Sequence, residues 1–301
     1  MKPGWMRGIA AMFRLTQAVL LCVACLLMVA ACSENAVEPN PSATFKLGVL
    51  PNQDKSKMQE SYAGLVRHLE TATGLKIELR IPDDYAQLLD WFVNKEIDLA
   101  MFGGVTFVKA NKQVGAVPLV MRDIDIRFHS VVLVKRDSGA ASIADLKGKS
   151  FSFGSELSTS GHLMPRYYFQ QLGIDPEQDF TTVNYSGAHD KTALLVQAGK
   201  AFAGVVNGSI VKEMFADGRL SPEKVKQLWE SPIYADYVWA MQQDLFEING
   251  TTIRDAFMAL SRSIAADKAI LDALGAGYYI PASVDDFQSL SRIMGQLDML
   301  R

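Results

Sequence analysis

Short apolar runs alternate with amphipathic segments along most of this chain, and this alternation limits the possible folds more than any other feature. The amphipathic segments carry apolar residues at helical spacing, and the sequence from position 251 to the end is mostly helical in pattern. Strands that alternate with helices typically build parallel or mixed sheets covered by helices. The sequence therefore predicts an α/β protein, with strands at 45–50, 75–81, 97–102, 116–121, 129–135, 149–154, 180–187, 201–207, 225–230 and 236–241.

The first 31 residues have the layout of a secretory signal, with basic residues ahead of an apolar stretch. The small residues before Cys32 resemble a bacterial lipobox, which predicts lipidation of Cys32 and a flexible tether over 32–44. Because the apolar stretch is close to the shortest that spans a membrane, an uncleaved anchor remains an alternative. Both interpretations place the rest of the chain outside the cytoplasm, at a membrane surface.

All three cysteines lie at or before position 32, so the body of the chain has neither thiols nor disulfides. Its stability must come from an apolar core, which about 255 residues can supply. After Cys32 the chain carries 27 basic and 33 acidic residues, a net charge of −6. This charge disfavours nucleic acid as a partner. It also means that local donors, and not the overall field, would have to hold an anionic ligand.

Small residues join a strand to a helix at three places, which are 102–105, 154–161 and 185–189. In open α/β sheets such joints lie at the carboxyl ends of strands, where helix N-termini present free N–H groups to ligands. At the second joint, Ser158, Thr159 and Ser160 would add hydroxyl donors for an oxyanion, and Gly161 would keep the backbone close. A simple N-cap role for Ser158 or Thr159 would explain the same residues.

Two motifs in the second half, STSGHLMPRYY and YSGAHDKTALLVQAGK, resemble segments of the substrate-binding proteins of phosphonate- and phosphite-type ABC importers. The segment PDDYAQLLDWFVNKEIDLAMFGG is similar to a first-lobe segment of the same family. The likeness runs from about residue 45 to the C-terminus, and YADYVW adds a similarity to a subgroup commonly labelled selenate-binding. The resemblance implies a monomeric binding protein that serves an ABC permease. The thiol-free body and the scattered histidines predict that it is no enzyme and needs no metal or cofactor.

The same resemblance implies a type II periplasmic-binding-protein fold, in which two α/β lobes are linked by two crossover strands. Lobe 1 would comprise residues 45–128 and 238–301, and lobe 2 residues 129–237. The crossovers would lie near 128–134 and 237–241.

A small tetrahedral oxyanion such as phosphite, phosphate or a phosphonate would bind in the cleft between the lobes. Carried over by position, the ligand-binding residues would be Tyr85, Ser130, Ser158, Thr159, Ser160 and His189, with Gly104, Phe128, Asp190 and Tyr237 as further candidates. Members that bind aminophosphonates hold the amine with carboxylates. This chain has Ser209 and Tyr237 at those positions, with Asp236 one residue away, so we expect a ligand without an amine.

Four other functions would draw on the same residues. His189 and Asp190 beside a serine cluster suggest a hydrolase, but the chain has no G-x-S-x-G nucleophile motif. The histidines lack the spacing of metal ligands and no cysteine is available, so a metal-capturing protein is not expected. Selenate as the ligand, or a sensor that reports to a membrane receptor, would use the same cleft and both remain alternatives.

Overall fold

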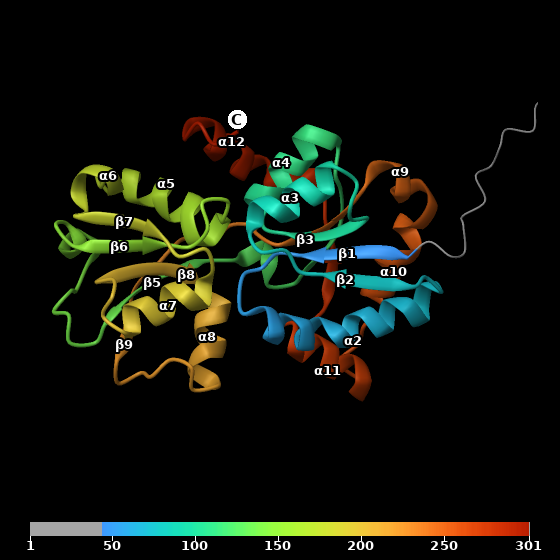
Figure 1. Ribbon diagram of the computed structural model, residues 1–301, viewed down its shortest axis with the longest axis horizontal. Coiled ribbons are helices and arrows are strands. Elements are labelled where there is room, and N and C mark those ends of the chain that lie inside the picture. Colours follow the sequence, from blue (N-terminus) through green and yellow to red (C-terminus); the bar gives the residue numbers. More distant parts are fainter. Residues whose placement is uncertain (1–43, 301) are drawn as a thin grey trace, which may run out of the picture. The chain divides into compact units, whose positions relative to one another are not determined.

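Two β-sheets organise residues 44–300, the part of the chain that the computed structural model describes (Figure 1). The first sheet has six strands in the order β11-β4-β10-β3-β1-β2, and the second has five in the order β7-β6-β8-β5-β9. The strands are β1 (Phe45–Val49), β2 (Ile77–Arg80), β3 (Leu99–Phe102), β4 (Val117–Arg122), β5 (Ser130–Lys135), β6 (Ser150–Phe153), β7 (Thr182–Tyr185), β8 (Ala203–Asn207), β9 (Val225–Glu230), β10 (Val238–Met241) and β11 (Tyr279–Pro281).

Helices connect most of these strands. The α-helices are α2 (Lys55–Thr73), α3 (Tyr85–Val93), α4 (Gly104–Val114), α5 (Met164–Gln171), α6 (Pro176–Asp179), α7 (His189–Gln197), α8 (Gly208–Ala216), α9 (Gln243–Leu245), α10 (Thr251–Met258), α11 (Ala265–Ala273) and α12 (Gln288–Gln296). Short 3-10 helices occur at Asp125–Arg127, Ile143–Leu146 and Val284–Phe287, and π-helical turns at Thr159–Leu163 and Phe246–Gly250.

In the six-stranded sheet, β1 runs parallel to β2 and β3, whereas β10 is antiparallel to β3 and β4. Helices α3 and α4 lie on one side of it and α2 and α11 on the other (Figure 1). Its neighbouring strands β3 and β10 are buried along their whole length, which explains their unbroken apolar sequences. Asp54 caps the N-terminus of helix α2, because its side chain accepts hydrogen bonds from two amides of the first turn. Gly74 caps the C-terminus with a φ of 72°.

In the five-stranded sheet, β6 is parallel to β7 and β8, and β5 is antiparallel to β8 and β9. An aromatic cluster fills the core on one face. The Phe151 ring stacks on Phe180 at 4.8 Å and meets Phe153 and Phe169 edge to face. Residues of α7 and α8 form the core on the other face. The sheet is therefore covered on both sides, as a parallel α/β arrangement requires.

Two antiparallel segments, 123–129 and 231–237, connect the sheets. They pair at Phe128 and Tyr234, where each amide donates to the carbonyl of the other residue at 2.8 and 2.9 Å. The connections therefore lie a few residues before those expected. Positions 130–134 and 238–241, which the resemblance placed in the crossovers, belong to β5 and β10 inside the sheets.

The predicted alternation of strands and helices is confirmed, with one addition near the C-terminus. Strand β11 lies in a region expected to be mostly helical, and it extends the first sheet beside β4. Its three residues are too few to give a period-two pattern. Among residues 44–300, no helix is both long and apolar enough to cross a membrane. The predicted signal segment and Cys32 lie outside the described residues.

Replacement of Phe151 by Ala should lower the free energy of unfolding by about 3–5 kcal/mol, because the substitution leaves a cavity in the aromatic cluster. Chemical denaturation followed by circular dichroism measures this loss. Leu172→Ala, at a side chain that is 56% exposed, is the matched control and should change stability little. Equal losses in the two variants would contradict the assignment of Phe151 to the core.

Candidate functional site

Hydrogen bonds tie together the turns that follow the parallel strands of both sheets. The Val105 amide, at the start of α4, donates to the Thr159 hydroxyl at 3.0 Å. The neighbouring Gly104 amide donates to the Asp236 carboxylate, also at 3.0 Å. The first and second joints predicted from the sequence are thus in direct contact. The third joint lies beside the second, because a Cβ added to Gly161 would approach Cε1 of His189 to 2.9 Å.

Ser158 and Thr159 use their oxygens as acceptors. Ser158 caps the π-helical turn, since its hydroxyl accepts from the Gly161 amide at 2.9 Å, and Thr159 accepts from Val105. The capping role considered for Ser158 is therefore real. The Ser158 hydroxyl still has its hydrogen to donate, so this residue can both cap the turn and bind an anion.

Four buried polar atoms in this region have no hydrogen-bond partner. They are the Tyr85 hydroxyl, the Ser160 hydroxyl, Nε2 of His189 and one carboxylate oxygen of Asp236. Among residues 44–300, the only other buried side-chain atom without a partner is a guanidinium nitrogen of Arg219. A buried polar group without a partner costs about 1–3 kcal/mol, and such groups are rare in native proteins. Their concentration here indicates a site built to receive a polar ligand.

The hydrogen bonds of His189 define its tautomer. The Asn207 amide donates to Nδ1 at 3.2 Å, so Nδ1 is an acceptor and Nε2 carries the hydrogen. Complete burial lowers the pKa of His189 to about 3, which keeps the ring neutral at physiological pH. The free Nε2–H is therefore a neutral donor. Burial also raises the pKa of Tyr85 well above its usual value, so its hydroxyl keeps its proton.

Asp236 brings a carboxylate to the same place. Burial raises its pKa to about 6, although the hydrogen bond from Gly104 opposes the shift. Thr159 and Ser160 also lie close enough to favour its charged form. The site thus combines several donors with one acceptor whose second oxygen is free.

Glycines allow this close packing. A Cβ on Gly161 would come within 2.9 Å of both Ser158 and His189, and one on Gly104 within 2.4 Å of Leu290. Gly104 was a predicted ligand contact, but its amide donates to the Asp236 carboxylate and is not free for a ligand. The role expected for Gly161 agrees with the structure.

The remaining predicted residues lie around this cluster with their polar groups engaged. The Ser130 hydroxyl is hydrogen-bonded to the Tyr234 hydroxyl at 2.5 Å. Phe128 is buried against the Tyr237 ring, with 5.4 Å between centroids. A carboxylate oxygen of Asp190 accepts from the Asp54 amide at 2.9 Å, which makes Asp190 a contact between helices α7 and α2.

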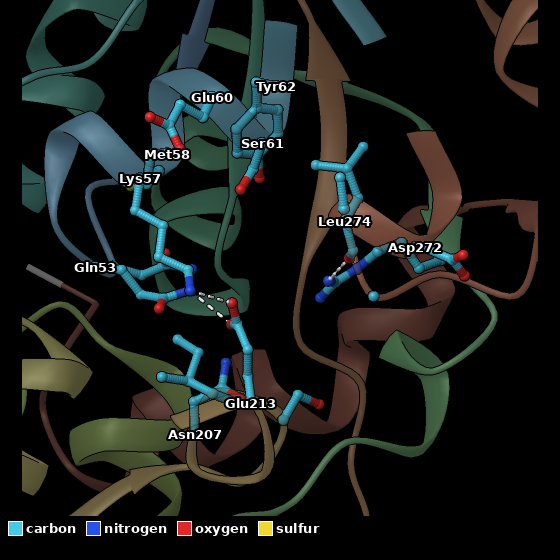
Figure 2. Close-up of a pocket in the computed structure, with 16 residues that line it drawn as sticks. Gln53, Lys57, Met58, Glu60, Ser61, Tyr62, Asn207, Glu213, Asp272 and Leu274 are labelled. Carbon is cyan, nitrogen blue, oxygen red and sulfur yellow. Dashed lines mark hydrogen bonds and ion pairs between the residues drawn. The ribbon is translucent and has the colours of Figure 1, made fainter. Parts of the chain in front are cut away.

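A cavity of about 590 Å³ lies beside the cluster, and Figure 2 shows its lining. Lys57 of α2 reaches Glu213 of α8 at 2.7 Å, across this cavity, and Asp217 at 2.9 Å. Burial alone would lower the pKa of Lys57, but its hydrogen bonds to the two carboxylates raise it. Ser209, predicted to stand where relatives have an amine-binding carboxylate, lines this cavity. It is not one of the residues with an unpartnered polar atom.

Asn52, Asn207 and Asp236 were not among the predicted site residues. Asp236 entered the prediction only as the neighbour of Tyr237. The two asparagines carry no local signal, because Asn52 acts through His189 and Tyr237, more than 100 positions away, and Asn207 acts through the same two residues, 18 and 30 positions away. Within residues 44–300, no three His, Cys, Asp or Glu side chains are grouped as metal ligands.

Comparisons with known proteins assign the family. A family model for the periplasmic substrate-binding protein of phosphonate ABC transporters matches residues 47–287. A probable phosphite-binding ABC transporter protein, PhnD1 of Prochlorococcus marinus, is 28% identical over 274 residues, which cover 87% of this chain and 92% of that protein. A phosphate-import protein, PhnD of Mycolicibacterium smegmatis, is 30% identical and covers 74% of this chain and 75% of its own.

Solved structures agree with this assignment. PhnD1 of Prochlorococcus marinus in complex with methylphosphonate superposes with a TM-score of 0.82, at 28% identity, over 86% of this chain and all of that one. A binding component of an ABC phosphonate transporter from Pseudomonas aeruginosa has a TM-score of 0.77 at 19% identity, over 83% and 85% of the chains. The expected periplasmic-binding-protein fold is confirmed. The chain belongs to the family of periplasmic substrate-binding proteins of phosphonate ABC transporters.

Proposed function

We propose that the protein is a lipid-anchored receptor that encloses a small, protonated tetrahedral oxyanion between its two lobes and delivers it to an ABC permease. The observation that carries this proposal is the group of four unpartnered polar atoms, on Tyr85, Ser160, His189 and Asp236. They come from both sheets and from the segment between them, so a single ligand would have to contact all of these parts.

The donors suit an oxyanion. The Tyr85 hydroxyl and the Nε2–H of His189 have no acceptor of their own, and the hydroxyl hydrogen of Ser158 adds to them. The hydroxyls of Thr159 and Ser160 lie beside Asp236 and can donate either to it or to the ligand. Hydrogen bonds to an ionised acceptor are roughly twice as strong as neutral ones. A ligand with negatively charged oxygens would use this set fully.

The free oxygen of Asp236 selects among oxyanions. A carboxylate next to a fully ionised anion would be repelled, whereas a P–OH group donates a hydrogen bond to it. Phosphate keeps a P–OH group at neutral pH, and phosphite and alkylphosphonates can take one up because their second ionisation lies close to neutrality, whereas sulfate and selenate stay fully ionised. This favours the phosphorus oxyanions over the selenate alternative.

An amine on the ligand has no evident partner. The Gly104 amide holds one oxygen of Asp236, and the proposed P–OH group would use the other. Glu213 of the neighbouring cavity is paired with Lys57. Burying an unpaired ammonium costs several kcal/mol. Methylphosphonate or phosphite should therefore bind more tightly than aminoethylphosphonate.

The relatives support this range of ligands. Their names refer to phosphite, phosphate and phosphonates, and the structure with a TM-score of 0.82 contains methylphosphonate. The lobe boundaries proposed for this chain are residues 45–128 with 238–301, and residues 129–237.

Asp236→Asn should weaken the binding of methylphosphonate and phosphite by about tenfold or more, because the acceptor for the P–OH group is lost. Sulfate should bind relatively better, since the amide can donate to it. Calorimetry at pH 7.5 with the three ligands measures the change. Asp137→Asn, at an exposed carboxylate, is the control. An unchanged preference for phosphite over sulfate would refute the role of Asp236.

His189→Asn tests the neutral, buried state of the ring without ligand. The unfolded state binds a proton at a pKa near 6.5, whereas the folded state resists protonation down to about 3. His189 therefore makes the wild type lose stability as the pH falls through this window. The stability of the wild type relative to the variant should fall by up to about 1.4 kcal/mol per pH unit between pH 6 and 4. A difference that does not change with pH would show that His189 is not buried and neutral.

Cys32→Ser should release the protein from membranes or leave its leader uncleaved, because the acylated cysteine is the proposed anchor. Membrane fractionation and intact-mass analysis of the mature protein measure both effects. The wild type should carry an acylated N-terminal Cys32. A mature wild-type protein that begins elsewhere without lipid would rule out the anchor.

A further inference from the structure

Four hydrogen bonds link Asn52, His189, Asn207 and Tyr237 into a closed ring beside the proposed oxyanion site. We call this network the amide ring. The His189 amide donates to the Asn52 carbonyl at 3.1 Å, and the Asn207 amide donates to Nδ1 of His189 at 3.2 Å. The side-chain amides of Asn207 and Asn52 both donate to the Tyr237 hydroxyl, at 3.0 and 3.3 Å. All four residues thus belong to one closed network.

The ring fixes which atoms are left to donate. The Asn207 side-chain oxygen accepts from the Ile210 amide at 3.0 Å, so its nitrogen must face Tyr237. Because the Tyr237 oxygen already accepts two hydrogen bonds, its own hydrogen is available to another acceptor. On the other side of the ring, the Asn207 amide leaves Nε2–H of His189 as the free donor.

The ring also joins the two lobes. Asn52 lies in the connection from β1 to α2, beside the six-stranded sheet. In the five-stranded sheet, His189 follows β7 and Asn207 is the last residue of β8, and Tyr237 lies in a segment that connects the sheets. The ring can therefore close only when the two sides are in contact.

We propose that Asn52 and Asn207 are positioning residues that turn the His189 ring and the Tyr237 hydroxyl into donors toward the ligand when the lobes close. This inference rests on the proposed function, because it assumes an oxyanion in the cluster. Neither asparagine needs to touch the ligand. Asn207 orients the His189 ring and the Tyr237 hydroxyl from the five-stranded sheet. Asn52 contacts the same two residues from the side of the six-stranded sheet.

Asn207→Asp reverses one hydrogen bond at nearly constant shape. The new carboxylate still accepts from the Ile210 amide and remains a good helix cap. Its second oxygen, however, accepts the Tyr237 hydroxyl hydrogen and removes it from the ligand. Methylphosphonate affinity, measured by calorimetry, should fall by about ten- to a hundredfold beyond the effect of the added charge. Thermal denaturation without ligand checks that the fold is retained.

Ser209→Asp is the control for charge, because Ser209 lies two residues further on and lines the same cavity without belonging to the amide ring. Tyr237→Phe provides the second arm. If Asn207 acts through Tyr237, the penalty of Asn207→Asp shrinks in the Tyr237→Phe background to that of Ser209→Asp. An equal penalty in both backgrounds, or one no larger than the control, overturns the inference.

Asn52→Ala gives an independent readout from the other side. Loss of its side-chain amide should speed methylphosphonate dissociation by about tenfold and change association less, because the closed state alone contains this bond. Unchanged dissociation in this variant also counts against the inference. If the wild type itself binds neither methylphosphonate, phosphite nor phosphate, both the proposed function and the inference are wrong. If the wild type binds one of these ligands and the variants bind it as the wild type does, the inference alone is wrong.

Discussion

The desolvation of polar atoms that have no partner is the constraint on which the rest of this structure depends. Bulk water does not reach the Tyr85 hydroxyl, the Nε2–H of His189 or the free Asp236 oxygen, because all three are buried. Folding must accept this cost in full. The surrounding contacts are arranged to hold these atoms in place, from the Gly104 amide on Asp236 to the Val105 amide on Thr159.

In the proposed function, these contacts would let a chain with a net negative body hold an anion. Neutral donors do not repel one another as a cluster of lysines would, and their hydrogens remain fixed by the backbone around them. His189 stays uncharged because burial disfavours its protonated form. Asp236, the charged group among these residues, would add selectivity for a ligand that brings its own proton. Binding by such a site would depend on the orientation of dipoles more than on net charge.

Local sequence patterns were sufficient for much of the fold and for half of the site. The alternation of apolar runs predicted the strands, and the small residues at 154–161 and 185–189 predicted the turns that carry Ser158 and His189. Tyr85 came from the family resemblance. Asp236 and Asn207 could not be found in this way, since each reaches the site through bonds to Gly104 and Tyr237 that no local spacing encodes. Ser130 stays a predicted ligand contact, and its hydrogen bond to the Tyr234 hydroxyl is one that no local pattern indicates.

The central claim is that His189 presents a neutral Nε2–H to an oxyanion, and nuclear magnetic resonance of the imidazole nitrogens tests it most directly. With ring-labelled histidine and saturating methylphosphonate at pH 7, the account predicts a hydrogen on Nε2, none on Nδ1, and a coupling from Nε2–H to the phosphorus atom through the hydrogen bond. Because burial holds the ring neutral, the same tautomer should be present before the ligand is added. A hydrogen on Nδ1, or an Nε2 signal that methylphosphonate leaves unchanged at saturation, would contradict the account.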